Sequence, residues 1–174
     1  MEYLVRGLRQ TVMKKKLTIT TAKRIGKSYY GKVKDRKLGE FLLVHVKAVA
    51  KTAQLLAQNK KVDRELLEIA AWVHYIGYAV QHEGHGALAV TLLQEQYTLS
   101  PTLRDCILEH SGDGRPKTLA GKIIQAADKI SIFDCSAIEV FLKHSHGRIG
   151  RGTVAFLRNK MTKEALDFLE NWRL

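Results

Sequence analysis

The chain has 174 residues, of which 45% are hydrophobic and 26% charged, and it contains only two prolines. This balance is typical of a folded globular protein and excludes disordered and membrane-embedded chains. A domain of this length buries about two-thirds of the surface of its unfolded chain, so a hydrophobic core is available without disulfides.

The cysteines and the N-terminus give predictions about location. Cys106 and Cys135 lack the C-x-x-C spacing, so the sequence predicts neither a zinc ribbon nor a redox pair. The sequence has no 18-residue apolar run, and its first ten residues lack the charged-then-apolar order of a signal peptide. We therefore expect a reduced, cytoplasmic protein with no membrane partner.

The net charge of +12 is concentrated near the N-terminus. Residues 1–40 hold 12 Lys and Arg against 3 Asp and Glu, whereas residues 41–174 hold 17 against 14. Such a segment can neutralise the phosphates of nucleic acid, or it can be a solvated face. We divide the chain into a basic N-terminal segment, residues 1–37, with one or two short helices packed on the core, and a helical domain, residues 38–174.

Helical periodicity begins clearly at residue 38, where apolar side chains recur at three- and four-residue steps up to residue 56. Asp63 is the expected N-cap of the next helix, and Ser100 with Pro101 opens a later one. The further helices are expected, in chain order, over residues 66–77, 85–93, 101–110, 119–130, 132–142 and 153–172. No segment alternates with period two, so the predicted fold is all-α, a bundle of about six to eight helices.

Five polar residues lie on or beside the apolar sides of different predicted helices: His45, His74, His85, His110 and Asp128. Any one alone is more often a hydrogen-bonded core group than a ligand. If all five are buried in one core, each needs a hydrogen-bond partner, and each group without one costs about 1–3 kcal/mol of stability. A shared metal ion satisfies several of them at once. Imidazole and carboxylate groups suit divalent Mn, Fe, Ni, Co or Zn, and bundled helices can converge on one ion.

The order of these residues resembles the HD superfamily of metal-dependent phosphohydrolases. The resemblance covers roughly residues 38–142, and its motifs are His45, AWVHYIG at 71–77, HEGHG at 82–86, ILEH at 107–110 and AADK at 126–129. It implies one metal held by His45, His74 and Asp128 and a second held by His85 and His110. It also implies hydrolysis of a nucleotide or other phosphate ester by metal-activated water.

Two positions depart from the family pattern. Tyr75 stands where the family has the aspartate of the His-Asp pair, and Tyr78 stands where a lysine commonly follows the glycine. A phenol with a reference pKa of about 10 is neutral at pH 7 and a poor ligand, so we expect one ion rather than two.

Three outcomes follow from these departures. The first is a mononuclear enzyme, and the second is replacement of the missing carboxylate by Glu83 or Glu109. The third is a degenerate domain that binds nucleotide, nucleic acid or a protein partner without turnover.

The resemblance implies catalytic roles for His74, Asp128 and Lys129, and Arg115 and Lys129 are the nearest candidates to bind the substrate phosphate. The expected partner is a phosphate-containing small molecule or nucleotide. Tyr29 and Tyr30, within the basic residues 1–37, suggest nucleic acid as a second partner, through charge and stacking. The sequence is also compatible with a homo-oligomer.

Overall fold

The protein is described by a computed structural model that covers residues 14–111, 113–134 and 140. Its elements are β1 (Lys15–Lys16), α1 (Ile19–Tyr30), α2 (Arg36–Leu56), α3 (Arg64–Val73), α4 (His85–Gln94), β2 (Tyr97–Thr98), α5 (Pro101–Leu108), α6 (Leu119–Ile130) and a short 3-10 helix, η1 (Ser131–Phe133). The all-α fold class is therefore confirmed.

Helix starts follow the local sequence closely. Asp63 accepts a hydrogen bond from the backbone N–H of Leu66, and Ser100 accepts one from that of Leu103, as expected for N-caps. Helix α2 begins two residues earlier than predicted, because Asp35 accepts hydrogen bonds from the backbone N–H groups of Lys37 and Leu38. Polar side-chain caps thus mark where α2, α3 and α5 begin.

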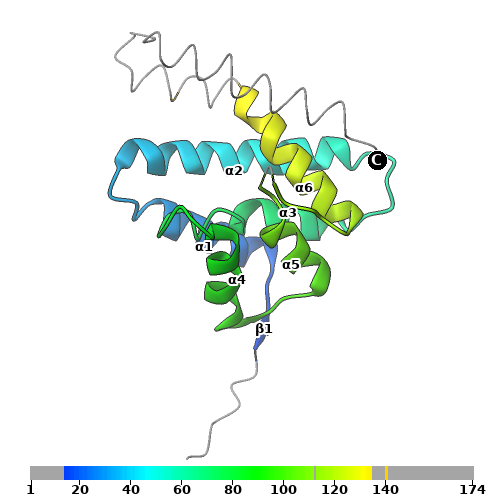
Figure 1. Cartoon of the computed structure of the whole chain (residues 1–174), viewed down its shortest axis with the longest axis horizontal. Helices are drawn as coiled ribbons and strands as arrows, with labels where there is room; N and C mark the ends of the chain where they lie inside the picture. Colours follow the sequence, from blue (N-terminus) through cyan, green and yellow to red (C-terminus); the bar gives the residue numbers. More distant parts are fainter. Residues whose placement is uncertain (1–13, 112, 135–139, 141–174) are drawn as a thin grey trace, which may run out of the picture.

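The longest helix, α2, runs across the molecule, with α6 crossing it and α3 packed against it (Figure 1). Helix α5 packs on α6, and α1 packs on α3. Helix α3 is the centre of the core, since its residues Leu67 and Ile69 to Val73 are all buried. Helices α2, α3 and α6 therefore all pack against one another.

Helix α1 lies within the basic segment and contributes to the core. Ala22, Gly26 and Tyr30 are buried, and the Tyr30 hydroxyl donates a 2.9 Å hydrogen bond to the backbone oxygen of Trp72 at the end of α3. A Cβ on Gly26 would lie 2.7 Å from that same oxygen, so the close approach of α1 to α3 requires glycine here.

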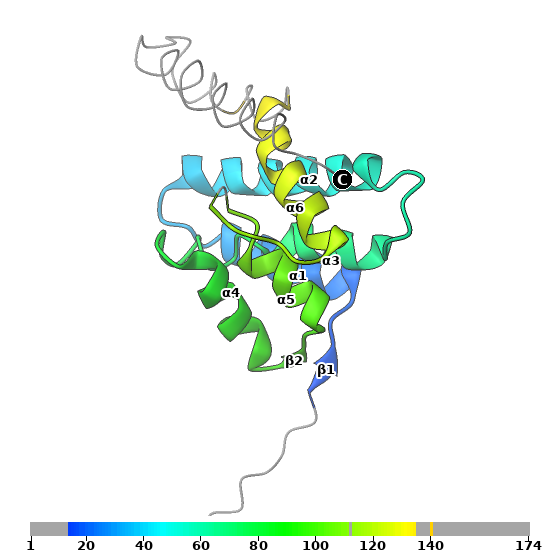
Figure 2. The ribbon, with the colours of Figure 1, turned by 45° about the vertical axis from the view of Figure 1, so that its right-hand side comes forward.

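Three expectations need correction or lie outside the described residues. No strand was predicted, yet Lys15–Lys16 pair in parallel with Tyr97–Thr98 (Figure 2), because two residues are too few to show a period. Residues 132 and 133, where a further helix was predicted to begin, belong instead to the 3-10 helix η1, and Asp134 after them is extended. Residue 140 is helical, but the rest of that helix and the whole of 153–172 lie outside the described residues.

The described helices include none that combines the length and the apolar character needed to cross a bilayer.

Candidate metal centre

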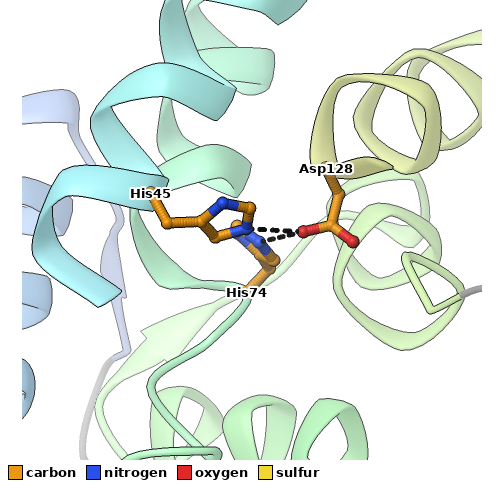
Figure 3. Close-up of side chains that lie close together, drawn as sticks. All are labelled: His45, His74 and Asp128. Carbon is orange, nitrogen blue, oxygen red and sulfur yellow. Dashed lines mark hydrogen bonds and ion pairs between the residues drawn. The ribbon is translucent and has the colours of Figure 1, made fainter. Parts of the chain in front are cut away.

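Three buried side chains from three parts of the fold meet around one point (Figure 3). His45 comes from α2, His74 follows α3 directly, and Asp128 comes from α6; all are at most 2% exposed. Asp128 Oδ1 lies 2.8 Å from His45 Nε2 and 3.4 Å from His74 Nε2. One ligand atom from each residue lies within 4.8 Å of the others, so the three can hold a single ion.

Helical period explains two of these placements. His45 shares the buried face of α2 with Leu42, Val46 and Val49, and Asp128 lies on the buried side of α6 beside Ile124. His74 is placed differently, because it is the C-cap of α3 and its backbone N–H still donates to Ala70.

The other two predicted ligands form a pair of their own. His85 is the first residue of α4 and half-buried, whereas His110 lies beyond the end of α5 and is 1% exposed. Their Nε2 atoms are 2.8 Å apart. The expectation that all four histidines lie along helix stripes is therefore wrong for His74 and His110. The apolar pattern continues into buried turns after each helix, so periodicity does not reveal where the helix stops.

Hydrogen bonds to the backbone fix the tautomer of three histidines. The Nδ1 atoms of His74, His85 and His110 lie 2.8–2.9 Å from the carbonyl oxygen of the residue three positions earlier. A carbonyl oxygen only accepts, so each Nδ1 carries the hydrogen and each neutral ring has its lone pair on Nε2. The facing lone pairs of His85 and His110 repel each other unless a cation or a proton binds them.

A proton is disfavoured at this pair. Burial lowers the pKa of His85, and burial together with nearby His74 lowers the pKa of His110 to about 3. Both rings are therefore neutral at pH 7 and present free lone pairs. Such lone pairs are the form of imidazole that binds transition metals.

Asp128 supplies the negative charge. Burial raises the pKa of a carboxyl group, but the hydrogen bond from His45 and the charge of Lys129 outweigh burial and hold the Asp128 pKa well below its ordinary value. Among the described residues, His74 Nε2 has no hydrogen-bond partner, and Asp128 Oδ2 has only its ion pair with Lys129. A buried polar atom without a partner is costly, and a divalent cation would give His74 Nε2 a partner, so the residues present fit a metal ion.

Tyr75 occupies the space between the two groups of histidines. Its ring centroid lies 4.5 Å from that of His74, 5.3 Å from that of His45, and 5.2 Å from those of both His85 and His110. An aromatic ring thus stands among the donors where the resembled family has a carboxylate.

The structure does not bring either proposed replacement carboxylate to this point. Glu83 is exposed. Glu109 accepts a 2.9 Å hydrogen bond at Oε2 from the backbone N–H of Arg115, so it holds the loop that follows α5. The group of three possible ligands found within the described residues contains neither glutamate.

The two cations predicted to bind substrate differ in position. Lys129 Nζ lies 3.2 Å from Asp128 Oδ2, and the Lys129 side chain is only 16% exposed. The Arg115 side chain is exposed, and it is the Arg115 backbone that is tied to Glu109. Lys129 is therefore the cation beside the candidate metal centre.

Sequence reasoning missed the surroundings of Tyr75. Tyr78 and His85 contact its ring, and His82 contacts that of Tyr78. The signal was present in the spacing, since positions 75, 78, 82 and 85 are three or four residues apart.

The chain is similar to known proteins both in sequence and in fold. The family model of the HD domain matches residues 42–132. Ribonuclease Y of Desulforamulus reducens and that of Desulforudis audaxviator are each 38% identical over 105 residues, and that of Acetivibrio thermocellus is 36% identical. The match covers 58% of this chain but only 20% of each relative, so the chain spans about a fifth of their length.

A solved structure shares the fold. The crystal structure of a predicted HD superfamily hydrolase from an uncultured Thermotogales bacterium aligns with a TM-score of 0.56 and 20% sequence identity. The alignment covers 87% of this chain and 86% of that one.

Proposed function

The chain belongs to the HD domain family, and on that premise we propose that it is a metal-dependent phosphohydrolase that cleaves a phosphate ester of a nucleotide or of RNA. The observation that carries the proposal is the convergence of His45, His74 and an ionised Asp128, whose ligand atoms lie within 4.8 Å of one another. RNA is included because the curated relatives are named Ribonuclease Y.

We assign one divalent transition metal, Mn, Fe, Ni, Co or Zn, to His45, His74 and Asp128. A bound ion of this kind supplies a lowered pKa for water and positive charge beside the phosphoryl oxygens. Three protein ligands leave coordination positions open. His85 and His110 can bind a second ion only through two neutral imidazoles, so one ion is the expected number.

Residues of the chain itself orient the metal ligands and are placed to bind the phosphate. The backbone oxygen of Ala71 holds the His74 ring with Nε2 directed at Asp128, 3.4 Å from Oδ1. Lys129 places its ammonium group beside the centre, where it can donate hydrogen bonds to a phosphate oxygen. Arg115 remains a proposed contact for a longer substrate, since its loop follows His110 directly.

A second candidate function is binding without turnover, and Tyr75 is the observation that favours it. The ring stands where a bridging carboxylate is expected, and it contacts all four histidines. A nucleotide, a nucleic acid or a protein partner would then be held at the same centre.

The basic segment supports a nucleic-acid partner in either case through its charge. The expected stacking on Tyr30 is wrong, because that side chain is buried and bonded to Trp72. Residues 14–37, the described part of that segment, contain ten cations and a single acidic residue, Asp35. Lys14, Lys15 and Lys16 are all exposed. A cytoplasmic location and a homo-oligomer stay predictions.

The test is elemental analysis of the full chain purified without chelator, followed by a panel of cyclic nucleotides, linear nucleotides and single-stranded RNA. We expect close to one transition metal ion per chain and turnover of at least one substrate. The control variant Glu83→Gln removes an exposed carboxylate from the same region and should change neither.

The outcomes separate the candidates. Metal without turnover on any substrate would favour the binding function over the hydrolase. The absence of bound metal, even after incubation with each of the five ions, would contradict the proposed centre.

A further inference from the structure

A row of aromatic rings leads from the candidate metal centre to the surface. The Tyr75 ring contacts His74 at 4.5 Å and Tyr78 at 5.3 Å, and the Tyr78 ring contacts His82 at 4.9 Å. His85 lies beside this row, 5.4 Å from Tyr78 and stacked on Tyr75 at 5.2 Å. Three ring contacts therefore connect buried His74 with exposed His82.

The outer end of the row is accessible and apolar. Tyr78 is half-buried and His82 is exposed. Val80, in the same turn, is 61% exposed and is one of two large hydrophobic side chains that are exposed among the described residues. Aromatic and apolar surface is thus gathered at the edge of a polar centre.

The turn that carries these side chains is held by its own hydrogen bonds. The backbone N–H groups of Val80 and Gln81 both donate to the oxygen of Gly77, and His85 Nδ1 donates to the oxygen of His82. A Cβ on Gly77 would overlap the backbone oxygen of His85, so α4 packs directly on this turn. The turn that carries Tyr78 and His82 is therefore held in place by its own hydrogen bonds and by α4.

The chemistry of the turn favours a flat, uncharged group over a phosphate. Residues 78–84, YAVQHEG, contain no lysine or arginine and one glutamate. The two cations proposed to bind phosphate are elsewhere, Lys129 beside the centre and Arg115 in an exposed loop. Because the row begins at His74, one of the proposed metal ligands, it starts at the place where the proposed function puts the phosphate.

We propose that Tyr78 and His82 form a stacking surface for the nucleobase next to the reacting phosphate, which makes an unpaired, single-stranded nucleic acid the preferred substrate. The inference rests on the proposed function, because that function places the phosphate. Base stacking on an aromatic side chain strengthens binding about fivefold to a hundredfold per base and tolerates every base, since each has a π-face. In a duplex, the neighbouring base pairs stack on that face and cover it.

The experiment uses the full, metal-loaded chain and a short 2′-O-methyl RNA strand that carries 2-aminopurine, whose fluorescence falls on stacking. The wild-type chain should quench the fluorescence and should bind the single strand at least about fivefold more tightly than the matching duplex. His82→Ala and Tyr78→Leu should each weaken binding and reduce the quench. Tyr78→Phe should retain both, because the ring remains.

Controls keep the result decisive. His82 is exposed, so His82→Ala should fold even where Tyr78→Leu does not, and thermal unfolding checks each variant. Leu55→Ala, at an exposed position of α2, should leave binding unchanged. Unchanged affinity and quench in both ring variants, or equal affinity for duplex and single strand, would overturn the stacking surface.

The two proposals fail separately, because this measurement requires binding and no turnover. A quench that depends on Tyr78 in a chain with no hydrolytic activity would retain the stacking surface and reject the hydrolase. Hydrolysis without such a quench would retain the hydrolase and reject the stacking surface.

Discussion

The two groups of histidines in this protein contain the same donor atoms but differ in charge. His45 and His74 share an ionised carboxylate, Asp128, whereas His85 and His110 face each other with neutral lone pairs. Tyr75 lies between them and contributes a ring to both. Two pairs of imidazoles at similar spacing therefore do not form equivalent metal-binding groups when only one pair has a carboxylate beside it.

We expect charge to decide which of the two groups of histidines binds metal more tightly. A buried cation is stabilised when an anion repays part of its lost hydration. Asp128 Oδ1 lies within 3.4 Å of His45 and His74, whereas the charge of Asp128 acts on His85 and His110 without a contact and is outweighed there by burial. We therefore expect the group with Asp128 to hold metal more tightly, and four experiments test this ranking.

The largest effect is expected from Asp128→Ala, which removes the negative charge from the stronger group. Metal affinity should fall at least about a hundredfold, equivalent to about 2.7 kcal/mol. Competition with a chromogenic chelator measures this affinity. Alanine is a good helix former, so α6 should persist. Retention of wild-type affinity would show that the metal lies elsewhere.

The second-largest effect is expected on the free energy of unfolding of the metal-free chain as the pH changes. The folded-state pKa of His110, about 3, lies below its ordinary value of 6.5, so between these values the unfolded chain binds a proton that the folded chain does not. The free energy of unfolding should therefore fall as pH decreases, by about 2 kcal/mol between pH 6.5 and 5. His85, also lowered, acts in the same direction.

Urea denaturation in the presence of chelator measures this slope. The variant His110→Gln should flatten it, because the titrating ring is gone. The carboxyl group of Asp128 adds nothing in this window, since its folded pKa lies well below 3.8. Stability that does not change between pH 7 and 5 would contradict a neutral, buried His110.

The third effect tests Tyr75 as the element that separates the two groups. Tyr75→Asp places a carboxylate among all four histidines and should raise affinity for a second ion about tenfold, equivalent to about 1.4 kcal/mol. Calorimetric titration would count the ions. Tyr75→Phe keeps the ring without a carboxylate and should bind only one. A second ion in both variants would mean that charge is not the cause.

The smallest effect is expected from His85→Gln in the weaker group. Affinity for the first ion should change by less than about threefold, equivalent to about 0.7 kcal/mol. The same chelator competition measures it, beside Asp128→Ala. A loss as large as that of Asp128→Ala would place the ion between the two groups instead.

Much of the fold could be predicted from the sequence, and the reasons are local. Asp63 and Ser100 cap helices where expected, and the three- and four-residue spacing along α2 places His45 inward. The end of α3 could not be predicted in this way, because Ile76 and Gly77 remain buried after the helix stops. The pairing of β1 with β2 was likewise invisible in two residues.

The candidate site, like the fold, could be predicted in part from the sequence. The sequence identified the residues that could hold metal, and the structure brings the ligand atoms of His45, His74 and Asp128 together. Metal binding itself stays a prediction. The sequence also offered Glu109 as a replacement carboxylate, but the fold uses Glu109 to hold the backbone of Arg115. Such a choice depends on which group is nearest in space.

By itself, the sequence determined the all-helical class, the order of the helices and the inward position of the chemically active side chains, because helical period and capping act over a few residues. The family resemblance of the sequence had already grouped His45 and His74 with Asp128, and His85 with His110. The folded structure added the contacts within each group and the position of the Tyr75 ring between them. These contacts depend on how the helices from α2 to α6 pack, because they join residues far apart in the chain.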